Sequence, residues 1–297
     1  MNNFPKDGQK LYDLIKSKID IEKTTDVEIN EDNDTYVQDI YSEWRNIGKT
    51  LSYNDIKFLS QILASTVGRT INEKTPYLDC EIPTDGARIN ITIPPLTKNP
   101  TLSLRFHHIA FRNLETLVEK QMLTKEEALE LSYFVKTKKN IIVAGGTNSG
   151  KSTLLNALCN CIPEKERIII IEDTREIYLD NIKNTTYLTA PNEEASVKCV
   201  EISLRKNPDR IIYGEVRGAE ALSLIEAWNT GHQGGIATIH TNSAEAVFTR
   251  LRDLCGHKSA MDQSASIKEA VDIIVYIGFE NGRRKVLQIL DTKKSSK

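Results

Sequence analysis

Residues 145–152 place a lysine and a hydroxyl side chain directly after a glycine-rich turn. The segment reads Gly-Gly-Thr-Asn-Ser-Gly-Lys-Ser and fits the phosphate-binding pattern G-x-x-x-x-G-K-[ST]. Glycines let the backbone point its N–H groups at phosphate oxygens, and the N-terminus of a following helix adds partial positive charge. In this pattern Lys151 reaches the β and γ phosphates and Ser152 binds Mg²⁺. The segment therefore predicts a site for ATP or another nucleoside triphosphate, together with Mg²⁺.

The residues on either side of the loop support this prediction. The apolar run 140–144 predicts a strand, and 153–158 predict a helix. Strand, glycine loop and helix is the expected context of such a loop. We expect the nucleotide to contact one contiguous set of residues: Gly145, Gly146, Thr147, Asn148, Ser149, Gly150, Lys151, Ser152 and Thr153. Kinases, GTPases, helicases and transport motors all use this loop, so it leaves the reaction open.

Two carboxylates follow apolar strands beyond the loop. Glu172 comes directly after four isoleucines, and Glu215 follows the strand predicted at 210–214, whose centre is Ile-Ile-Tyr. Carboxylates at such strand ends can bind Mg²⁺ or activate the attacking water. We therefore expect both to be catalytic and to form the metal site with Ser152. The alternatives are an acidic strand exit at the surface for Glu172 and a helix-capping role for Glu215.

A third polar cluster ends the strand predicted at 235–240. Thr238 lies within this strand and His240 ends it. This pair could sense the γ-phosphate, which would make His240 catalytic alongside Lys151. A lone histidine at a strand end is more often structural, and spacing alone does not decide between the two roles.

Hydrophobic patterning predicts an α/β protein of two domains. In the first 110 residues we expect a hairpin around 27–37, a helix capped by Ser52, and strands at 87–93 and 102–106. A second capping box at Thr124 begins the region of strand and helix alternation, with five further strands: Arg167–Glu172, Arg210–Gly214, Gly235–His240, Val271–Ile277 and Lys285–Leu290. Such alternation predicts a parallel sheet covered on both faces. We place the domains at 1–110 and 124–297, with a linker at 111–123.

Two arginines of the first domain share a useful position. Arg88 and Arg105 each lie on the polar face of a predicted strand. The guanidinium group suits phosphate recognition because its N–H donors form a fixed fork. The pattern alone favours a simpler interpretation, in which both side chains lie on a solvated sheet face.

Composition excludes several classes of protein. The chain has 39% hydrophobic and 27% charged residues and a formal net charge of −2, so no strong global field attracts nucleic acid. No apolar run approaches the ~18 residues that span a bilayer, and the N-terminus lacks a signal-peptide core. We expect a cytoplasmic protein that can dock peripherally on a membrane complex. Five cysteines without a C-x-x-C pair predict free thiols rather than disulfides or zinc.

Four ordered segments resemble the signature boxes of the secretion (traffic) ATPases: 145–153, 168–177, 208–221 and 230–251. The most similar branch is the conjugal-transfer ATPase of type IV secretion systems. The string Gly-Glu-Val-Arg-Gly at 214–218 and the string Gly-Gly-Ile-Ala-Thr-Ile-His at 234–240 are typical of it. The resemblance covers roughly residues 20–290 and includes the segments around Arg88 and Arg105.

This resemblance implies a PAS-like α+β N-terminal domain and a RecA-like P-loop C-terminal domain, with the nucleotide between them. It implies a homo-hexameric ring at the cytoplasmic face of the inner membrane, where ATP hydrolysis powers type IV secretion or conjugative transfer. Secretion-channel and coupling proteins would be its partners. Arg88 and Arg105 match the family's N-terminal-domain arginines that approach the triphosphate. Glu172, Glu215 and His240 match the family's acidic and histidine boxes.

Several alternatives can be compared with this resemblance. Type II secretion relatives carry a tetracysteine zinc insert that is absent here, whereas pilus-retraction ATPases are harder to exclude. A nucleotide-gated assembly scaffold without turnover is a further alternative. A GTPase would need an [NT]-K-x-D motif, which the chain lacks. Direct sequence-specific binding of nucleic acid is not expected, because no basic stripe with interleaved aromatic residues occurs.

Overall fold

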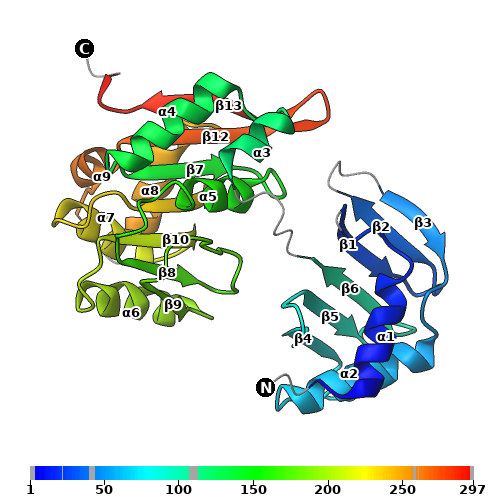
Figure 1. The fold of residues 1–297 in the computed structure, drawn as a ribbon. Coiled ribbons are helices and arrows are strands. Elements are labelled where there is room, and N and C mark those ends of the chain that lie inside the picture. Colours follow the sequence, from blue (N-terminus) through cyan, green and yellow to red (C-terminus); the bar gives the residue numbers. More distant parts are fainter. Residues whose placement is uncertain are drawn as a thin grey trace. The chain divides into compact units, whose positions relative to one another are not determined.

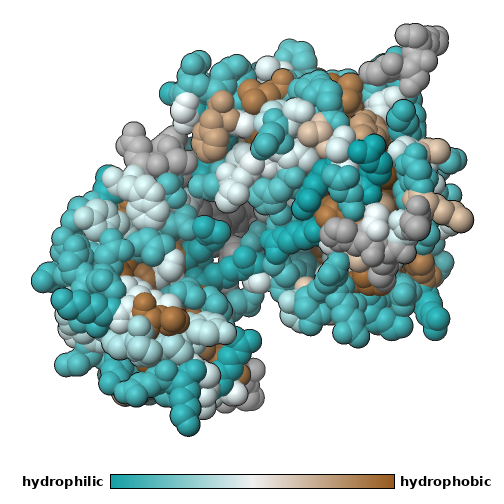
Figure 2. Space-filling model, turned by 180° about the vertical axis from the view of Figure 1, so that it is seen from behind, coloured by the Kyte–Doolittle hydropathy of each residue, from teal (hydrophilic) through white to brown (hydrophobic). Residues whose placement is uncertain are grey.

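The computed structural model describes residues 4–21, 23–39, 44–106, 113–256, 259 and 261–294. The chain divides into two compact units, Met1–Ala110 and Phe111–Lys297, each with its own sheet (Figure 1). Within the described ranges, no helix combines the length and the apolar character needed to cross a bilayer. On the face drawn in Figure 2, both units are mainly hydrophilic and their hydrophobic residues lie in small separate groups.

The first unit is a six-stranded antiparallel sheet in the order β3-β2-β1-β6-β5-β4. Its strands and helices are α1 Lys6–Lys16, β1 Thr24–Ile29, β2 Thr35–Asp39, β3 Trp44–Gly48, α2 Tyr53–Thr66, β4 Tyr77–Glu81, β5 Arg88–Thr92 and β6 Thr101–Arg105. The core lies between the two helices and one face of the sheet. Polar side chains of alternate strand positions lie on the other face.

The predicted hairpin and the capping box at Ser52 are confirmed. The sequence did not indicate β3, β4 or α1. In β3 the only partly buried residue is Ile47, and in β4 only Leu78 is fully buried, so neither strand shows an alternating apolar pattern. Helix α1 buries Tyr12 and Ile15, and its remaining apolar residues, Leu11 and Leu14, are only partly buried or exposed.

The second unit is a seven-stranded sheet in the order β13-β12-β7-β11-β10-β8-β9. Its strands are β7 Ile141–Gly145, β8 Ile168–Glu172, β9 Thr185–Thr189, β10 Arg210–Val216, β11 Ile236–His240, β12 Ile273–Glu280 and β13 Arg283–Asp291. Its helices are α3 Leu114–Glu119, α4 Lys125–Lys136, α5 Lys151–Cys159, α6 Glu193–Leu204, α7 Glu220–Asn229, α8 Ala246–Gly256 and α9 Ser264–Ala270. Helices α3, α4 and α5 cover one face, and α6, α7, α8 and α9 cover the other.

The prediction of a parallel sheet is confirmed except at one edge. Strands β12, β7, β11, β10, β8 and β9 run parallel, whereas β13 is antiparallel to β12. Asn281 and Gly282 both have positive φ and form a tight hairpin turn there, so no crossover helix intervenes. Strand β9 was not predicted, because it is a half-exposed edge strand without apolar alternation. The described part of the predicted linker contains α3, whose Leu114 packs in the second unit's core.

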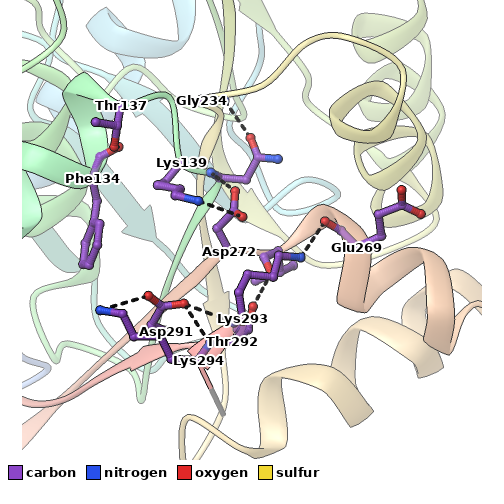
Figure 3. A network of polar contacts seen from close by, with 12 residues as sticks. Phe134, Thr137, Lys139, Gly234, Glu269, Asp272, Asp291, Thr292, Lys293 and Lys294 are labelled. Atoms are coloured by element: carbon purple, nitrogen blue, oxygen red, sulfur yellow. Dashed lines mark hydrogen bonds and ion pairs between the residues drawn. The ribbon is translucent and has the colours of Figure 1, made fainter. Parts of the chain in front are cut away.

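Polar groups fasten the starting ends of the central strands together (Figure 3). Asn140 precedes β7, and its Oδ1 accepts hydrogen bonds from the backbone of Gly234 and Gly235 at 2.7 and 3.0 Å. Its Nδ2 donates to the carbonyl of Ala270 at 2.7 Å, and its backbone N–H donates to Asp272 at 3.0 Å. Asn140 thus joins β7, β11 and the start of β12 through its side chain and its backbone N–H.

The end of β13 is tied to the same place. Thr292 donates its backbone N–H to the carbonyl of Asp272 at 2.9 Å. The ammonium group of Lys293 donates to the carbonyls of Lys268 and Glu269 at 2.6 and 2.9 Å, which caps the end of α9 (Figure 3). We call Asn140, Asp272, Thr292 and Lys293 the polar clamp.

Arg210 reinforces the same end of the sheet. Its side chain is fully buried, and it makes a two-pronged ion pair with Glu166 at 2.6 and 3.0 Å. It also donates to the carbonyls of Val135 and Gly234. The starting ends of the strands are therefore held by polar contacts, of which those of Arg210 and the Asn140 side chain are the most buried. The opposite ends of the strands remain available to form a site.

Candidate functional site

The glycine loop lies at the carboxyl end of β7, as the sequence predicted. Every residue of β7 is buried, and α5 begins at Lys151 directly after the loop. Asn148 and Gly150 have φ of 58° and 97°, and the αL conformation is tolerated by asparagine and favoured by glycine. A Cβ at Gly150 would lie 2.9 Å from Met122 Cε, so a larger residue would also be crowded there. Ser149 Oγ donates to the carbonyl of Gly146 at 2.8 Å and closes the loop.

Lys151 is held inside this loop. Its side chain is buried, its Nζ donates to the carbonyl of Gly146 at 2.7 Å, and it lies 3.4 Å from His240 Nδ1. Burial lowers the pKa of this ammonium, although the negative charge of Glu215 opposes the shift. A phosphate oxygen would compete with the Gly146 carbonyl for the same donor. Ser152 is exposed at the first turn of α5.

His240 stands beside the loop because β11 pairs with β7 in parallel, with His240 opposite Gly145. Its Nε2 lies 2.8 Å from Glu215 Oε1. These contacts fit a neutral imidazole whose Nε2–H donates to Glu215 and whose Nδ1 accepts from Lys151. Burial, and then the charge of Lys151, lower the pKa of His240, which favours this neutral form. The structure thus brings Lys151, His240 and Glu215 together.

The second oxygen of Glu215 binds Arg217. Arg217 Nη2 donates to Glu215 Oε2, and Arg217 Nη1 donates to Asp173 Oδ2 at 2.9 Å. The hydrogen bond to Glu215 raises the pKa of the Arg217 guanidinium. Charged groups of alternating sign therefore connect the ends of β10 and β8.

Glu172 is the buried acid of the site, with 7% of its surface exposed. Its Oε1 accepts the backbone N–H groups of Glu176 and Ile177, both at 3.0 Å. Oε2 has no hydrogen-bond partner among the described residues. Burial raises the pKa of Glu172 to about 8, although the two backbone hydrogen bonds oppose the shift. A Cβ at Gly214 would lie 3.1 Å from Glu172 Cγ, so a larger residue at this position would press against the acid.

Both acids face one pocket of about 330 Å³. Its lining is Glu172, Asp173, Ala190, Pro191, Asn192, Glu193, Ser196, Tyr213, Glu215, Arg217, Gly218 and Glu220. Within the described part of the chain, no cluster of His, Cys, Asp and Glu is arranged to hold a metal ion unaided. Mg²⁺ usually combines one or two carboxylates with water and phosphate oxygens. The buried Oε2 of Glu172, which lacks a hydrogen-bond partner among the described residues, is an oxygen of that kind. The exposed Ser152 hydroxyl on α5 is another, although no residue of the phosphate loop lines this pocket.

The two arginines of the first unit lie side by side. Arg88 of β5 is directly opposite Arg105 of β6 in the antiparallel register. Arg105 Nε donates to Asp26 Oδ1 at 2.7 Å, while 62% of the Arg105 side chain stays exposed. Both arginines lie on the polar face of their sheet, as predicted. The phosphate loop and the two acids belong to the other unit.

Comparison with known proteins identifies the family. The model of the family described as "Type II/IV secretion system protein" matches residues 20–277. The chain belongs to this family. The resemblance to its type IV secretion and conjugal-transfer ATPases, drawn from the four motifs, is confirmed.

This secretion-system protein is 34% identical to the probable conjugal transfer protein TrbB of Sinorhizobium fredii over 236 residues, 78% of the chain and 72% of that relative. It is 31% identical to the type IV secretion system protein VirB11 of Bartonella quintana over 293 residues, 83% and 82% of the two chains. Its fold is similar to that of the Legionella pneumophila ATPase DotB, with a TM-score of 0.72. That match covers 97% of this chain and 82% of DotB at 19% identity, and it shows the fold alone.

Sequence reasoning about this family member missed three side chains. Asp173 and Arg217 lie within the segments 168–177 and 208–221, close to Glu172 and Glu215, and no sequence pattern indicated their ion pair. Asn156 lies in the helix after the loop, where nothing distinguished it from other polar residues. Its contacts with residues 176–178 connect α5 to the segment that holds Glu172.

Proposed function

We propose that the protein is a hexameric ATPase motor that hydrolyses ATP with Mg²⁺ to power type IV secretion or conjugative transfer. The observation that carries the proposal is the contact chain from Lys151 through His240 to Glu215 at the end of the phosphate loop. It joins a cation for the phosphates to a carboxylate that can accept a proton. Membership of a family of secretion ATPases supports ATPase activity in general terms.

Each residue of the site has a role in this proposal. The N–H groups of the loop and Lys151 bind the β and γ phosphates. Glu215 accepts the proton of the attacking water, and His240 orients Glu215 through its Nε2–H. Mg²⁺, when bound, neutralises charge on the phosphate oxygens, and Ser152, Glu172 and Glu215 would hold it.

The first unit would complete the charge around the triphosphate. We assign it a PAS-like fold and the second unit a RecA-like fold. Arg88 and Arg105 supply two fixed cationic forks, which suit the developing charge of phosphoryl transfer. Their side-by-side arrangement across β5 and β6 supports a joint role, because one phosphate group can accept hydrogen bonds from both.

The ring would act at the cytoplasmic face of the inner membrane as a peripheral protein. Secretion-channel and coupling proteins are the partners proposed from the family. Purified protein with Mg²⁺ and ATP should release phosphate. The Glu215→Gln variant should bind ATP and release no phosphate. A wild-type protein that binds ATP and never hydrolyses it would refute the motor and favour an assembly scaffold. If Glu215→Gln loses ATP binding as fully as ATP hydrolysis, Glu215 has a structural role rather than a catalytic one.

A further inference from the structure

Helix α5 carries Asn156, and Asn160 caps the end of the helix one turn later. Both asparagines hold the segment that follows β8. We propose that Asn156 is a positioning residue, which ties Glu172 to the phosphate-loop helix so that nucleotide binding sets the orientation of this acid. The inference rests on the proposed function, because Glu172 is one of its catalytic acids.

Asn156 holds the backbone on both sides of a buried residue. Its Nδ2 donates to the carbonyl of Glu176 at 2.5 Å, and its Oδ1 accepts the N–H of Tyr178 at 2.9 Å. Ile177 lies between these two contacts and is fully buried in the core of that face. The segment is therefore fixed by two hydrogen bonds and one apolar anchor.

The same segment holds Glu172. The N–H groups of Glu176 and Ile177 both donate to Glu172 Oε1, so the position of this backbone decides where Oε2 points. Glu172 is buried and its Oε2 has no hydrogen-bond partner among the described residues, so these two amides are the contacts that orient the carboxylate. A shift of the 176–178 backbone must move the carboxylate with it.

Helix α5 provides the other end of the connection. It begins at Lys151, and Asn156 follows within the first two turns. An α-helix is held by regular i→i−4 hydrogen bonds and moves largely as a rigid rod over this length. A displacement of the helix start by bound phosphate is passed to Asn156, then to the 176–178 backbone and to Glu172.

Asn160 offers a matched control. Its Nδ2 donates to the carbonyl of Tyr178 at 3.0 Å, and its Oδ1 accepts the N–H of Asp180 at 2.9 Å. It therefore makes the same two kinds of hydrogen bond to the same segment. Its Nδ2 also donates to the carbonyl of Asn156 at 3.0 Å. It makes no hydrogen bond to Glu176 or Ile177, whose amides hold Glu172, so its loss should loosen the segment without releasing the acid.

The test compares Asn156→Ala and Asn160→Ala in the full chain. Misplacing a catalytic group by about 1 Å can cost on the order of 10²-fold in rate. We expect Asn156→Ala to lower kcat at least about tenfold with KM unchanged, and Asn160→Ala to change kcat less than about twofold. Hydrogen exchange of the Glu176 and Ile177 amides should be faster in Asn156→Ala only. Wild-type protein should protect these amides further when ADP is added without Mg²⁺, and Asn156→Ala should lose that protection.

Equal losses of kcat in both variants would overturn the inference, as would wild-type kcat in Asn156→Ala. If Asn156→Ala does not fold, Asn156→Asp keeps the acceptor for Tyr178 and loses the donor to Glu176. Its new oxygen would repel the Glu176 carbonyl, so kcat should fall in this variant too, and wild-type kcat there would also overturn the inference. Failure of the proposed function would show differently, as wild-type protein that does not hydrolyse ATP. The hydrogen-exchange experiment with ADP would still test the link through Asn156 in such a protein.

Discussion

Because Glu172 is buried, we predict that the free energy of unfolding decreases as the pH rises. Its pKa rises from 4.5 for an ordinary glutamate to about 8 in the folded protein. Between these values the folded protein keeps a proton that the unfolded chain has released. The contribution of Glu172 is therefore fully present below the lower value and is lost as the pH rises through the higher one.

The size of the effect follows from the shift. One pKa unit corresponds to about 1.4 kcal/mol, and Glu172 is buried enough that water screens it little. Between pH 6 and pH 8 the free energy of unfolding should fall by about 2 kcal/mol through this group alone. Glu172→Gln keeps the shape of the side chain but cannot titrate. The free energy of unfolding of this variant, relative to wild type, should therefore rise by the same amount between pH 6 and pH 8.

The assay is urea unfolding at pH 6 and pH 8, followed by tryptophan fluorescence. Trp228 is buried in the second unit and reports its unfolding, whereas Trp44 is already half exposed in the first. Glu194→Gln on α6 is the control, because it removes an exposed carboxyl. If wild type and Glu172→Gln lose the same stability over this range, the reasoning about Glu172 is wrong.

Four further predictions concern turnover, stability and assembly. Lys151→Ala should abolish ATP hydrolysis, and near-normal phosphate release would overturn the site assignment. Arg88→Ala and Arg105→Ala should each lower kcat by about 10³-fold in a steady-state assay, and wild-type rates would leave both on a solvated face. Arg210→Met should cost about 3–5 kcal/mol in urea unfolding, because it leaves Glu166 with only the more distant Lys138 Nζ at 3.8 Å, and a loss below about 1 kcal/mol would contradict a buried pair. Light scattering with ATP and Mg²⁺ should give six subunits, and a monomer at micromolar protein would count against the ring.

The phosphate loop could be predicted from the sequence because its chemistry lies in one contiguous segment. The glycines, Lys151 and Ser152 are adjacent in the chain, and the flanking strand and helix follow from their apolar patterns. Glu172, Glu215 and His240 could also be proposed, since each follows an apolar strand. Parallel strands bring their carboxyl ends to one edge, so three separate clusters were expected at the same place.

The contacts between these residues could not be predicted. Whether Arg217 pairs with Glu215, with Asp173 or with both depends on how β8 and β10 are placed, and no local pattern encodes that. The backbone that holds Glu172 is a segment without regular structure, so periodicity says nothing of it. Its link to Asn156 joins residues whose side-chain directions depend on the packing of α5.

The polar clamp has a practical consequence for handling the protein. Thr292 and Lys293 are among its members, and they bond to the start of β12 and the end of α9. A truncation before residue 291 would strand the carbonyls of Lys268, Glu269 and Asp272. Purification tags and fluorescent fusions should therefore be joined after residue 294, where the attachment leaves every one of these bonds in place.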